Sequence, residues 1–173
     1  MHHFHYRGGE LCAEEVPLRE LAERYGTPLF VYSHATLVRH VRRYQAAFGA
    51  AGQSALIAYS VKANPNLAIV RALANEGAGA DVVSLGELER ALAAGVPANR
   101  IVFAGVGKRP DELRRGIEVG ILQFNVEVEG ELDHLEGIAA ELGRPARVAL
   151  RVNPDVTPQT HDYIRTGGKA NKF

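Results

Sequence analysis

After Gly52 the chain alternates between short apolar runs and longer segments with the spacing of an amphipathic helix. The apolar runs predict five strands: Ala55–Val61, Ala80–Val83, Ile101–Ala104, Gln123–Val126 and Ala146–Val152. The intervening segments predict helices that begin near Pro65, Leu85, Pro110 and Glu129 and end near Gly77, Gly95, Gly120 and Gly143. Proline in the first turn and glycine just past the last turn are typical of helix boundaries. The pattern therefore indicates repeated strand-helix units.

The repeat length indicates how these units are connected. Lys62, Ser84, Gly105 and Val126 stand at successive strand ends, at intervals of 22, 21 and 21 residues. Nearly continuous apolar strands joined by helices of this length predict a parallel sheet with right-handed crossovers. Two α/β architectures fit, a (β/α)8 TIM-type barrel and an open doubly wound sheet. The barrel is favoured because no G-x-G-x-x-G sequence follows the first strand.

The segment before Gly52 has a different pattern. Phe4 to Tyr32 predicts extended pieces around one short helix that starts at Pro17, and Leu29–Tyr32 predicts a strand. Ser33 is a plausible N-cap of a longer helix. The apolar face expected for that helix consists of Leu37, Val41, Tyr44 and Phe48.

Composition adds few constraints. The 173 residues include 20 basic and 20 acidic residues, so the charge favours neither a nucleic acid nor a membrane as partner. Cys12 is the only cysteine and no apolar run reaches the ~18 residues of a membrane span, so we expect a cytoplasmic protein. The early histidines His2, His3 and His5 alternate with aromatic residues, and we expect no metal site there.

Catalytic residues of strand-helix units lie at the carboxyl ends of the strands, where Lys62 follows the first predicted strand. Apolar neighbours at such a position would disfavour the ammonium form and leave an amine able to attack an aldehyde. The alternative is a solvated lysine at the start of a loop, and the local sequence by itself favours that alternative.

Three charged residues and one loop share this end of the predicted sheet. Asp81 and Arg151 lie near strand ends, where they predict either a structural ion pair or a ligand site. Glu87 stands three residues after Ser84, a spacing that a helix capping box explains fully. Gly105-Val106-Gly107-Lys108 is more consistent with an ordinary turn than with a phosphate loop, because it lacks the P-loop spacing.

Together these segments resemble the alanine-racemase-type pyridoxal-phosphate decarboxylases, and within them the diaminopimelate decarboxylases. The resemblance covers nearly the whole chain in order. It is carried by the stretches Gly26–Tyr32, Tyr59–Asn64, Gly77–Glu87, Ile101–Lys108, Phe124–Glu127, Leu150–Pro154 and His161–Gly167, and by the final Asn171-Lys172-Phe173.

The resemblance implies a (β/α)8 barrel that binds pyridoxal 5'-phosphate, of which residues 34–173 would form about the first half. Residues 1–33 would contribute to the family's β-domain, and the protein would form a homodimer with shared active sites. Lys62 would be the Schiff-base lysine, with Asp81, Glu87 and Arg151 on the cofactor-binding wall. The family's phosphate loop and ring-pairing acid come later than Phe173.

The reaction implied is the decarboxylation of meso-2,6-diaminopimelate to L-lysine and CO2, the last step of lysine biosynthesis. Two alternatives remain open, a related decarboxylase of ornithine, arginine or carboxynorspermidine, and a racemase-type barrel that binds the same cofactor. Five predicted strands cannot close an eight-stranded barrel. We therefore expect residues 1–173 to be part of a longer protein and to be inactive alone.

Overall fold

The computed structural model of this α/β protein describes residues 2–153 and contains two separate sheets. The larger sheet has five parallel strands in sequence order. They are β4 (Ala58–Ser60), β5 (Gly79–Val82), β6 (Ile101–Phe103), β7 (Gln123–Val126) and β8 (Val148–Leu150). A parallel sheet in which each strand pairs with the next along the chain is the arrangement of a TIM-type barrel over part of its circumference.

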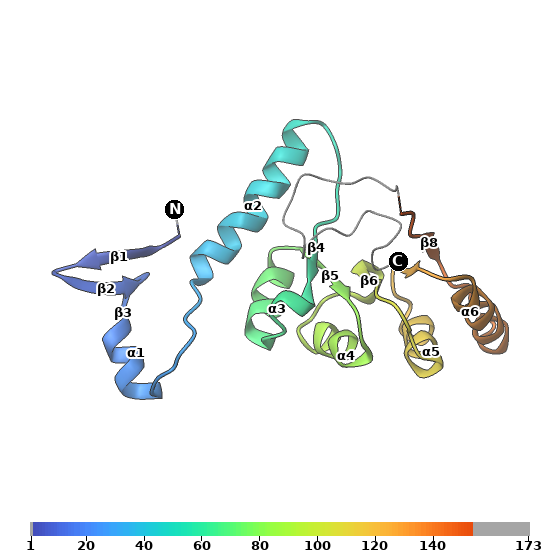
Figure 1. The fold of residues 1–173 in the computed structure, drawn as a ribbon. Helices are drawn as coiled ribbons and strands as arrows, with labels where there is room; N and C mark the ends of the chain where they lie inside the picture. Colours follow the sequence, from blue (N-terminus) through green and yellow to red (C-terminus); the bar gives the residue numbers. More distant parts are fainter. Residues whose placement is uncertain (1, 154–173) are drawn as a thin grey trace.

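Helices follow four of these strands and lie along one face of the sheet (Figure 1). They are α3 (Leu67–Asn75), α4 (Leu85–Ala93), α5 (Pro110–Val119) and α6 (Glu129–Leu142), with short 3-10 turns η1 (Val61–Ala63) and η2 (Ala98–Arg100). The five predicted parallel strands and the four helices between them are thus confirmed, with boundaries that differ by a few residues.

The two faces of the sheet differ in polarity because successive strand residues point to opposite sides. The residues that face the helices are apolar and almost fully buried, among them Ala80, Val82, Ile101, Phe103, Phe124 and Val126. Phe103 and Phe124 stack on neighbouring strands with ring centroids 6.1 Å apart. The alternate positions, including Asp81, Gln123 and Asn125, face the side that these helices leave open.

Glycine ends the helices as predicted. Gly120 follows α5 with φ +73° and its N–H donates to the Gly116 carbonyl, which also accepts from Ile121 N–H. That left-handed conformation costs an L-residue with a side chain about 1 kcal/mol or more, and glycine adopts it freely. The chain can therefore turn sharply out of α5 and enter β7 after a short connection.

The start of α3 differs from the prediction. We expected this helix to begin near Pro65, but α3 begins at Leu67. The side chain of Asn66 caps the helix by accepting from Ala68 N–H at 2.9 Å. Asn64 instead closes a turn, in which its side chain accepts from Asn66 N–H at 3.1 Å. The helix starts later because the 3-10 turn η1 occupies the residues that follow β4.

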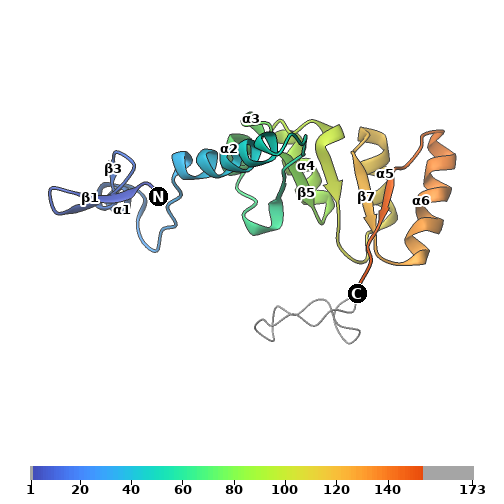
Figure 2. The same cartoon turned by 90° about the horizontal axis from the view of Figure 1, so that it is seen from above.

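The N-terminal segment forms a small unit of its own at one end of the molecule (Figures 1 and 2). Its antiparallel strands are β1 (Phe4–Arg7), β2 (Glu10–Ala13) and β3 (Val16–Pro17), followed by α1 (Leu18–Tyr25). The long helix α2 (His34–Ala50) then leads to the larger sheet. As predicted, the Ser33 side chain caps α2 and accepts from Thr36 N–H at 3.1 Å.

Two expectations for this region were wrong. Leu29–Tyr32 is not a strand, since it pairs with no strand among residues 2–153, and Phe30 is 85% exposed. The apolar face of α2 is also shifted. Val38 and Val41 are buried, and Val41 packs against Ile69 and Leu73 of α3, whereas Tyr44 and Phe48 are exposed. The second half of α2 is therefore less tightly packed on its apolar side than the first half.

Within residues 2–153, no helix is both long enough and apolar enough to cross a membrane.

Candidate active site

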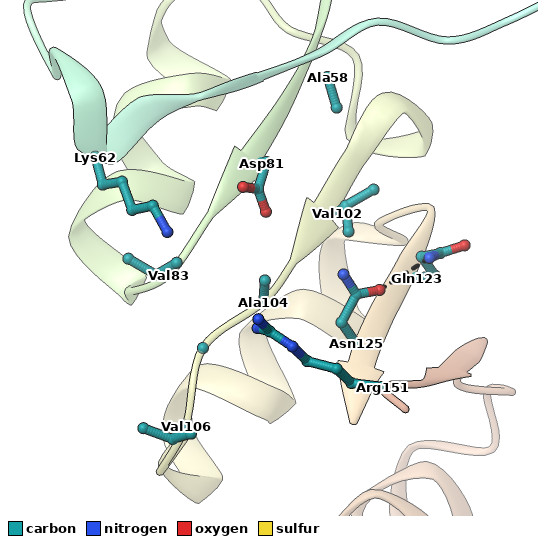
Figure 3. Close-up of a pocket in the computed structure, with 11 residues that line it drawn as sticks. Ala58, Lys62, Asp81, Val83, Val102, Ala104, Val106, Gln123, Asn125 and Arg151 are labelled. Carbon is teal, nitrogen blue, oxygen red and sulfur yellow. Dashed lines mark hydrogen bonds between the residues drawn. The ribbon is translucent and has the colours of Figure 1, made fainter. Parts of the chain in front are cut away.

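A cavity of about 810 Å3 lies on the open face of the five-stranded sheet, toward the carboxyl ends of its strands (Figure 3). That volume is in the range of small-molecule and cofactor sites. The lining residues come from all five strands and the turns that follow them: Ala58, Lys62, Asp81, Val83, Val102, Ala104, Gly105, Val106, Gln123, Asn125 and Arg151. Three of the four predicted site residues, Lys62, Asp81 and Arg151, are therefore brought to one cavity.

Lys62 is held by the 3-10 turn η1, directly after β4. Val61 beside it is fully buried and anchors the turn, while the Lys62 side chain projects into the cavity (Figure 3). Lys62 itself is exposed. The apolar burial that we expected around its amine is thus not found among residues 2–153.

Asp81 lies on the cavity side of β5, the strand between β4 and β6. Burial raises the pKa of the Asp81 carboxyl above its ordinary value, since water is excluded from the charged form. The Ser60 hydroxyl and then the charges of Lys62 and Arg151 lower the pKa of Asp81 and partly offset that rise. The Ser60 hydroxyl lies near Asp81 but forms no hydrogen bond of ordinary geometry with it.

Arg151 follows β8 and extends its guanidinium across the mouth of the cavity (Figure 3). We predicted Asp81 as its acidic partner, but within residues 2–153 Arg151 forms an ion pair with Glu127, at 3.1 Å between Nη1 and Oε1. Glu127 is closer because it follows β7, the strand adjacent to β8. Arg151 and Asp81 still line the same cavity, as expected, and interact at longer range.

The Gly105–Lys108 loop is a structural turn, in agreement with the favoured interpretation of its sequence. The Lys108 ammonium is buried and donates to the carbonyl oxygens of Gly105 and Asn125, both at 2.7 Å, and to Glu131 Oε1 at 2.8 Å. An ammonium has three N–H groups, and all three are used here. This lysine is therefore not directed at a phosphate in the cavity.

Glu87 does not line the cavity. Its Oε2 accepts from Val83 N–H at 2.8 Å, while Ser84 Oγ accepts from Glu87 N–H at 3.2 Å. This arrangement resembles the predicted capping box, except that the carboxylate reaches Val83 instead of Ser84. In the described chain Glu87 thus fixes the turn between β5 and α4, next to the cavity-lining Val83.

Sequence reasoning did not select Gln123 or Glu127 as site residues. Gln123 and Asn125 project into the cavity from β7 and are joined by a 2.9 Å hydrogen bond between Nε2 and Oδ1 (Figure 3). Glu127 is buried and connects Arg151 to Gly105, whose N–H donates to Glu127 Oε1 at 3.2 Å. The sequence signal that could have identified them is their spacing of two residues. Polar residues at alternate positions of a buried strand all point to one face, which must therefore border a polar space.

Comparisons with known proteins agree with this geometry. Residues 34–173 match the family model described as pyridoxal-dependent decarboxylase, pyridoxal binding domain. The chain is 51% identical over 171 residues to the diaminopimelate decarboxylase of Zymomonas mobilis, covering 98% of this chain and 41% of that protein. It is 54% identical over 170 residues to the diaminopimelate decarboxylase of Pseudomonas aeruginosa, covering 98% of this chain and 40% of that protein.

A solved structure shows the same fold. The diaminopimelate decarboxylase of M. jannaschii, in a co-complex with L-lysine, aligns with a TM-score of 0.89 and 44% identity over 98% of this chain and 40% of that one. The chain thus spans about two fifths of the length of the relatives that it matches. Because the family model covers most of the chain, the protein belongs to the pyridoxal-dependent decarboxylases, and residues 34–173 belong to their pyridoxal-binding domain.

Proposed function

We propose that the full-length protein decarboxylates meso-2,6-diaminopimelate to L-lysine and CO2 with pyridoxal 5'-phosphate as cofactor. In this reaction the bond from the D-configured carbon to its carboxylate breaks, CO2 leaves, and that carbon takes up one proton. The observation that carries the proposal is the convergence of Lys62, Asp81 and Arg151 on one cavity in a chain about half identical to diaminopimelate decarboxylases. The substrate is assigned from that identity over nearly the whole chain.

The groups in the cavity fit pyridoxal 5'-phosphate chemically. A primary amine, Lys62, suits an aldehyde, and the cations Lys62 and Arg151 suit an anionic ligand. When bound, the cofactor supplies an electron sink for the carbanion that forms as CO2 leaves. We propose that Lys62 holds the cofactor covalently and that Asp81 and Arg151 lie against it. Glu87 acts there only through the Val83 turn that it fixes.

Asp81 and Arg151 have distinct tasks in this proposal. The Asp81 carboxylate lies across the cavity from Lys62 and opposes its positive charge, which favours a defined position of the amine. Arg151 presents a planar guanidinium with several N–H donors, and its ion pair with Glu127 limits its motion. The negative charge of Asp81 and the positive charge of Arg151 thus orient a substrate that carries two ammonium and two carboxylate groups.

The larger assembly is also part of the proposal. Residues 1–33 contribute to a second, β-rich domain, and two copies of the full-length protein form a cytoplasmic homodimer with shared active sites. The separation of the β1–β3 unit from the larger sheet supports the first point, because such a unit has little core of its own (Figure 1). Light scattering of the full-length protein tests the dimer, and a monomer would contradict it.

The function is tested by locating the lysine that binds the cofactor and by measuring decarboxylation. In the full-length protein, borohydride reduction should fix the cofactor on Lys62, and Lys62→Ala should abolish both that adduct and the release of labelled CO2 from meso-diaminopimelate. Arg115→Met is the control that should keep both the adduct and the CO2 release, because it removes only an exposed ion pair with Glu89. An adduct on Lys108 or Lys169 would disprove the role of Lys62. Faster turnover of ornithine or arginine would show that the substrate is wrong.

A further inference from the structure

Four hydrogen bonds close a ring behind the cavity wall, at the ends of β6 and β7. Lys108 Nζ donates to the Gly105 carbonyl at 2.7 Å and to Glu131 Oε1 at 2.8 Å. Glu131 Oε2 accepts from Glu127 N–H at 2.9 Å, and Glu127 Oε1 accepts from Gly105 N–H at 3.2 Å. We call these four residues the Lys108 ring. It joins a loop, a strand end and the first turn of α6.

The ring is closed to water. The side chains of Lys108 and Glu131 are 2% and 5% exposed, and that of Glu127 is 1% exposed. Both oxygens of Glu131 accept hydrogen bonds within the ring. A buried ion pair adds little net stability compared with apolar residues of the same size, whereas losing one partner leaves a buried charge uncompensated. Such a pair therefore contributes by fixing one geometry and adds little to the stability of the fold.

What the ring holds in place is the cavity wall. Gly105 lines the cavity directly, and the third bond of Lys108 fixes the backbone of Asn125, another lining residue. The carboxylate of Glu127 reaches from the ring to the Arg151 guanidinium at 3.1 Å. Three components of the wall, contributed by β6, β7 and β8, thus depend on one buried ammonium.

We propose that Lys108 and Glu131 are positioning residues, which hold Glu127 so that it keeps the Arg151 guanidinium in the cavity. Lys108 does not contact a ligand, because all its N–H groups are used internally. It acts through Glu127, because Lys108 and Glu127 are both hydrogen-bonded to Gly105 and to Glu131. Its role in catalysis rests on the proposed function, but its effect on Arg151 is a property of this fold alone.

The first test uses nuclear magnetic resonance and needs no activity. In the full-length protein labelled with 15N, the Arg151 Nε–H signal should be a single sharp resonance in the wild type. In Lys108→Met and in Glu131→Gln it should broaden or split, because Glu127 loses its support. The control is Arg115→Met, which removes an exposed ion pair between Arg115 and Glu89 on neighbouring helices. An unchanged Arg151 signal in both ring variants would overturn the proposal.

The second test is a double-mutant cycle of Lys108→Met and Arg151→Met on decarboxylation. Each single variant should lower kcat/KM by about tenfold or more, as expected when a site group is misplaced. If Lys108 acts through Arg151, the double variant should be no more than about twofold worse than Arg151→Met, because coupled residues are non-additive. Full additivity would contradict the proposal.

A purely structural role predicts a different result. In that case Lys108→Met would lower the unfolding temperature and leave kcat, KM and cofactor affinity per folded molecule unchanged. If Lys108→Met does not fold, Glu131→Gln replaces it in the cycle, since it keeps volume and one carbonyl acceptor. A wild-type protein without decarboxylase activity would refute the proposed function, and the Arg151 resonance would still decide the role of the ring.

Discussion

At the residue scale, polar side chains decide the properties of the sheet's open face. Asp81, Gln123 and Asn125 occupy alternate positions in strands that are otherwise apolar. Each would carry a desolvation cost in a sealed core, so each indicates a space that admits a polar ligand or water. The pKa of the Asp81 carboxyl is raised and the pKa of the Glu14 carboxyl is lowered, and both shifts can be tested.

Asp81→Asn should raise the stability of the folded protein at pH 7. Burial raises the pKa of Asp81, so the folded state holds its proton more strongly than the unfolded state. Stability is therefore lost as pH rises from the ordinary carboxyl range through the raised pKa, and it is regained as pH falls. In urea unfolding, the free energy of unfolding of the Asn variant should exceed that of the wild type most at pH 7, and this difference should shrink toward pH 4. A constant difference between the two pH values would contradict this account.

Glu14→Gln should have the opposite pH dependence. The pKa of Glu14 is lowered chiefly by the Ala35 N–H, at 2.8 Å from Oε1, and then by the Ser33 hydroxyl, at 2.7 Å. The charged carboxylate thus stabilises the start of α2, and that contribution is present above the ordinary pKa and lost as pH falls through the lowered one. We expect a loss of about 1 kcal/mol at neutral pH, typical of helix capping groups. The urea unfolding stabilities of wild type and variant should converge as the pH falls below the ordinary carboxyl range.

At the scale of elements, the helices depend on their ends and on close approach to the sheet. Ser84 caps α4, Asn66 caps α3 and Gly120 ends α5, so side chains and turns define the boundaries independently of the core. The backbone of α5 comes especially close to β7 at Gly116. There Gly116 is buried against the ring of Phe124, which is itself fully buried.

Gly116→Ala should destabilise the protein and Gly137→Ala should stabilise it, although both glycines lie within helices. A methyl group at Gly116 would come within 2.6 Å of Phe124 Cζ, and overpacking of this kind costs about 1–3 kcal/mol. Gly137 in α6 is exposed and has no atom within 4 Å of the added carbon, so helix propensity gives a gain of about 0.5–1 kcal/mol. Thermal unfolding of both variants measures the difference. Equal effects would show that contact with Phe124 is unimportant.

At the scale of the whole molecule, β8 forms one edge of the described sheet and exposes apolar side chains. Val148 and Leu150 lie on the face that helices cover elsewhere, and Leu150 is 67% exposed. An apolar parallel edge is a template for association with another chain. These features are consistent with a sheet that other residues extend in the full-length protein.

Residues 1–173 expressed alone should therefore self-associate and release no CO2 from meso-diaminopimelate. Leu150→Lys should shift the population toward monomer, because a charge on an edge strand opposes pairing. Val106→Lys is the matched control, since Val106 is exposed in a loop and not on an edge strand. Multi-angle light scattering measures the mass. A monodisperse wild-type monomer with turnover would contradict both expectations.

The sequence by itself determined the repeating strand-helix order, most helix ends and the cavity positions of Lys62, Asp81 and Arg151. These features depend on local spacing, because apolar period, capping residues and glycines act within a few residues of each other. The pairing of Arg151 with Glu127, the burial of Lys108 and the exposure of Lys62 were decided by tertiary structure. The two ion pairs depend on which strands become neighbours in the folded sheet. They join residues that are more than twenty positions apart in the sequence, because a buried or partly buried charge pairs with the opposite charge that lies nearest in space.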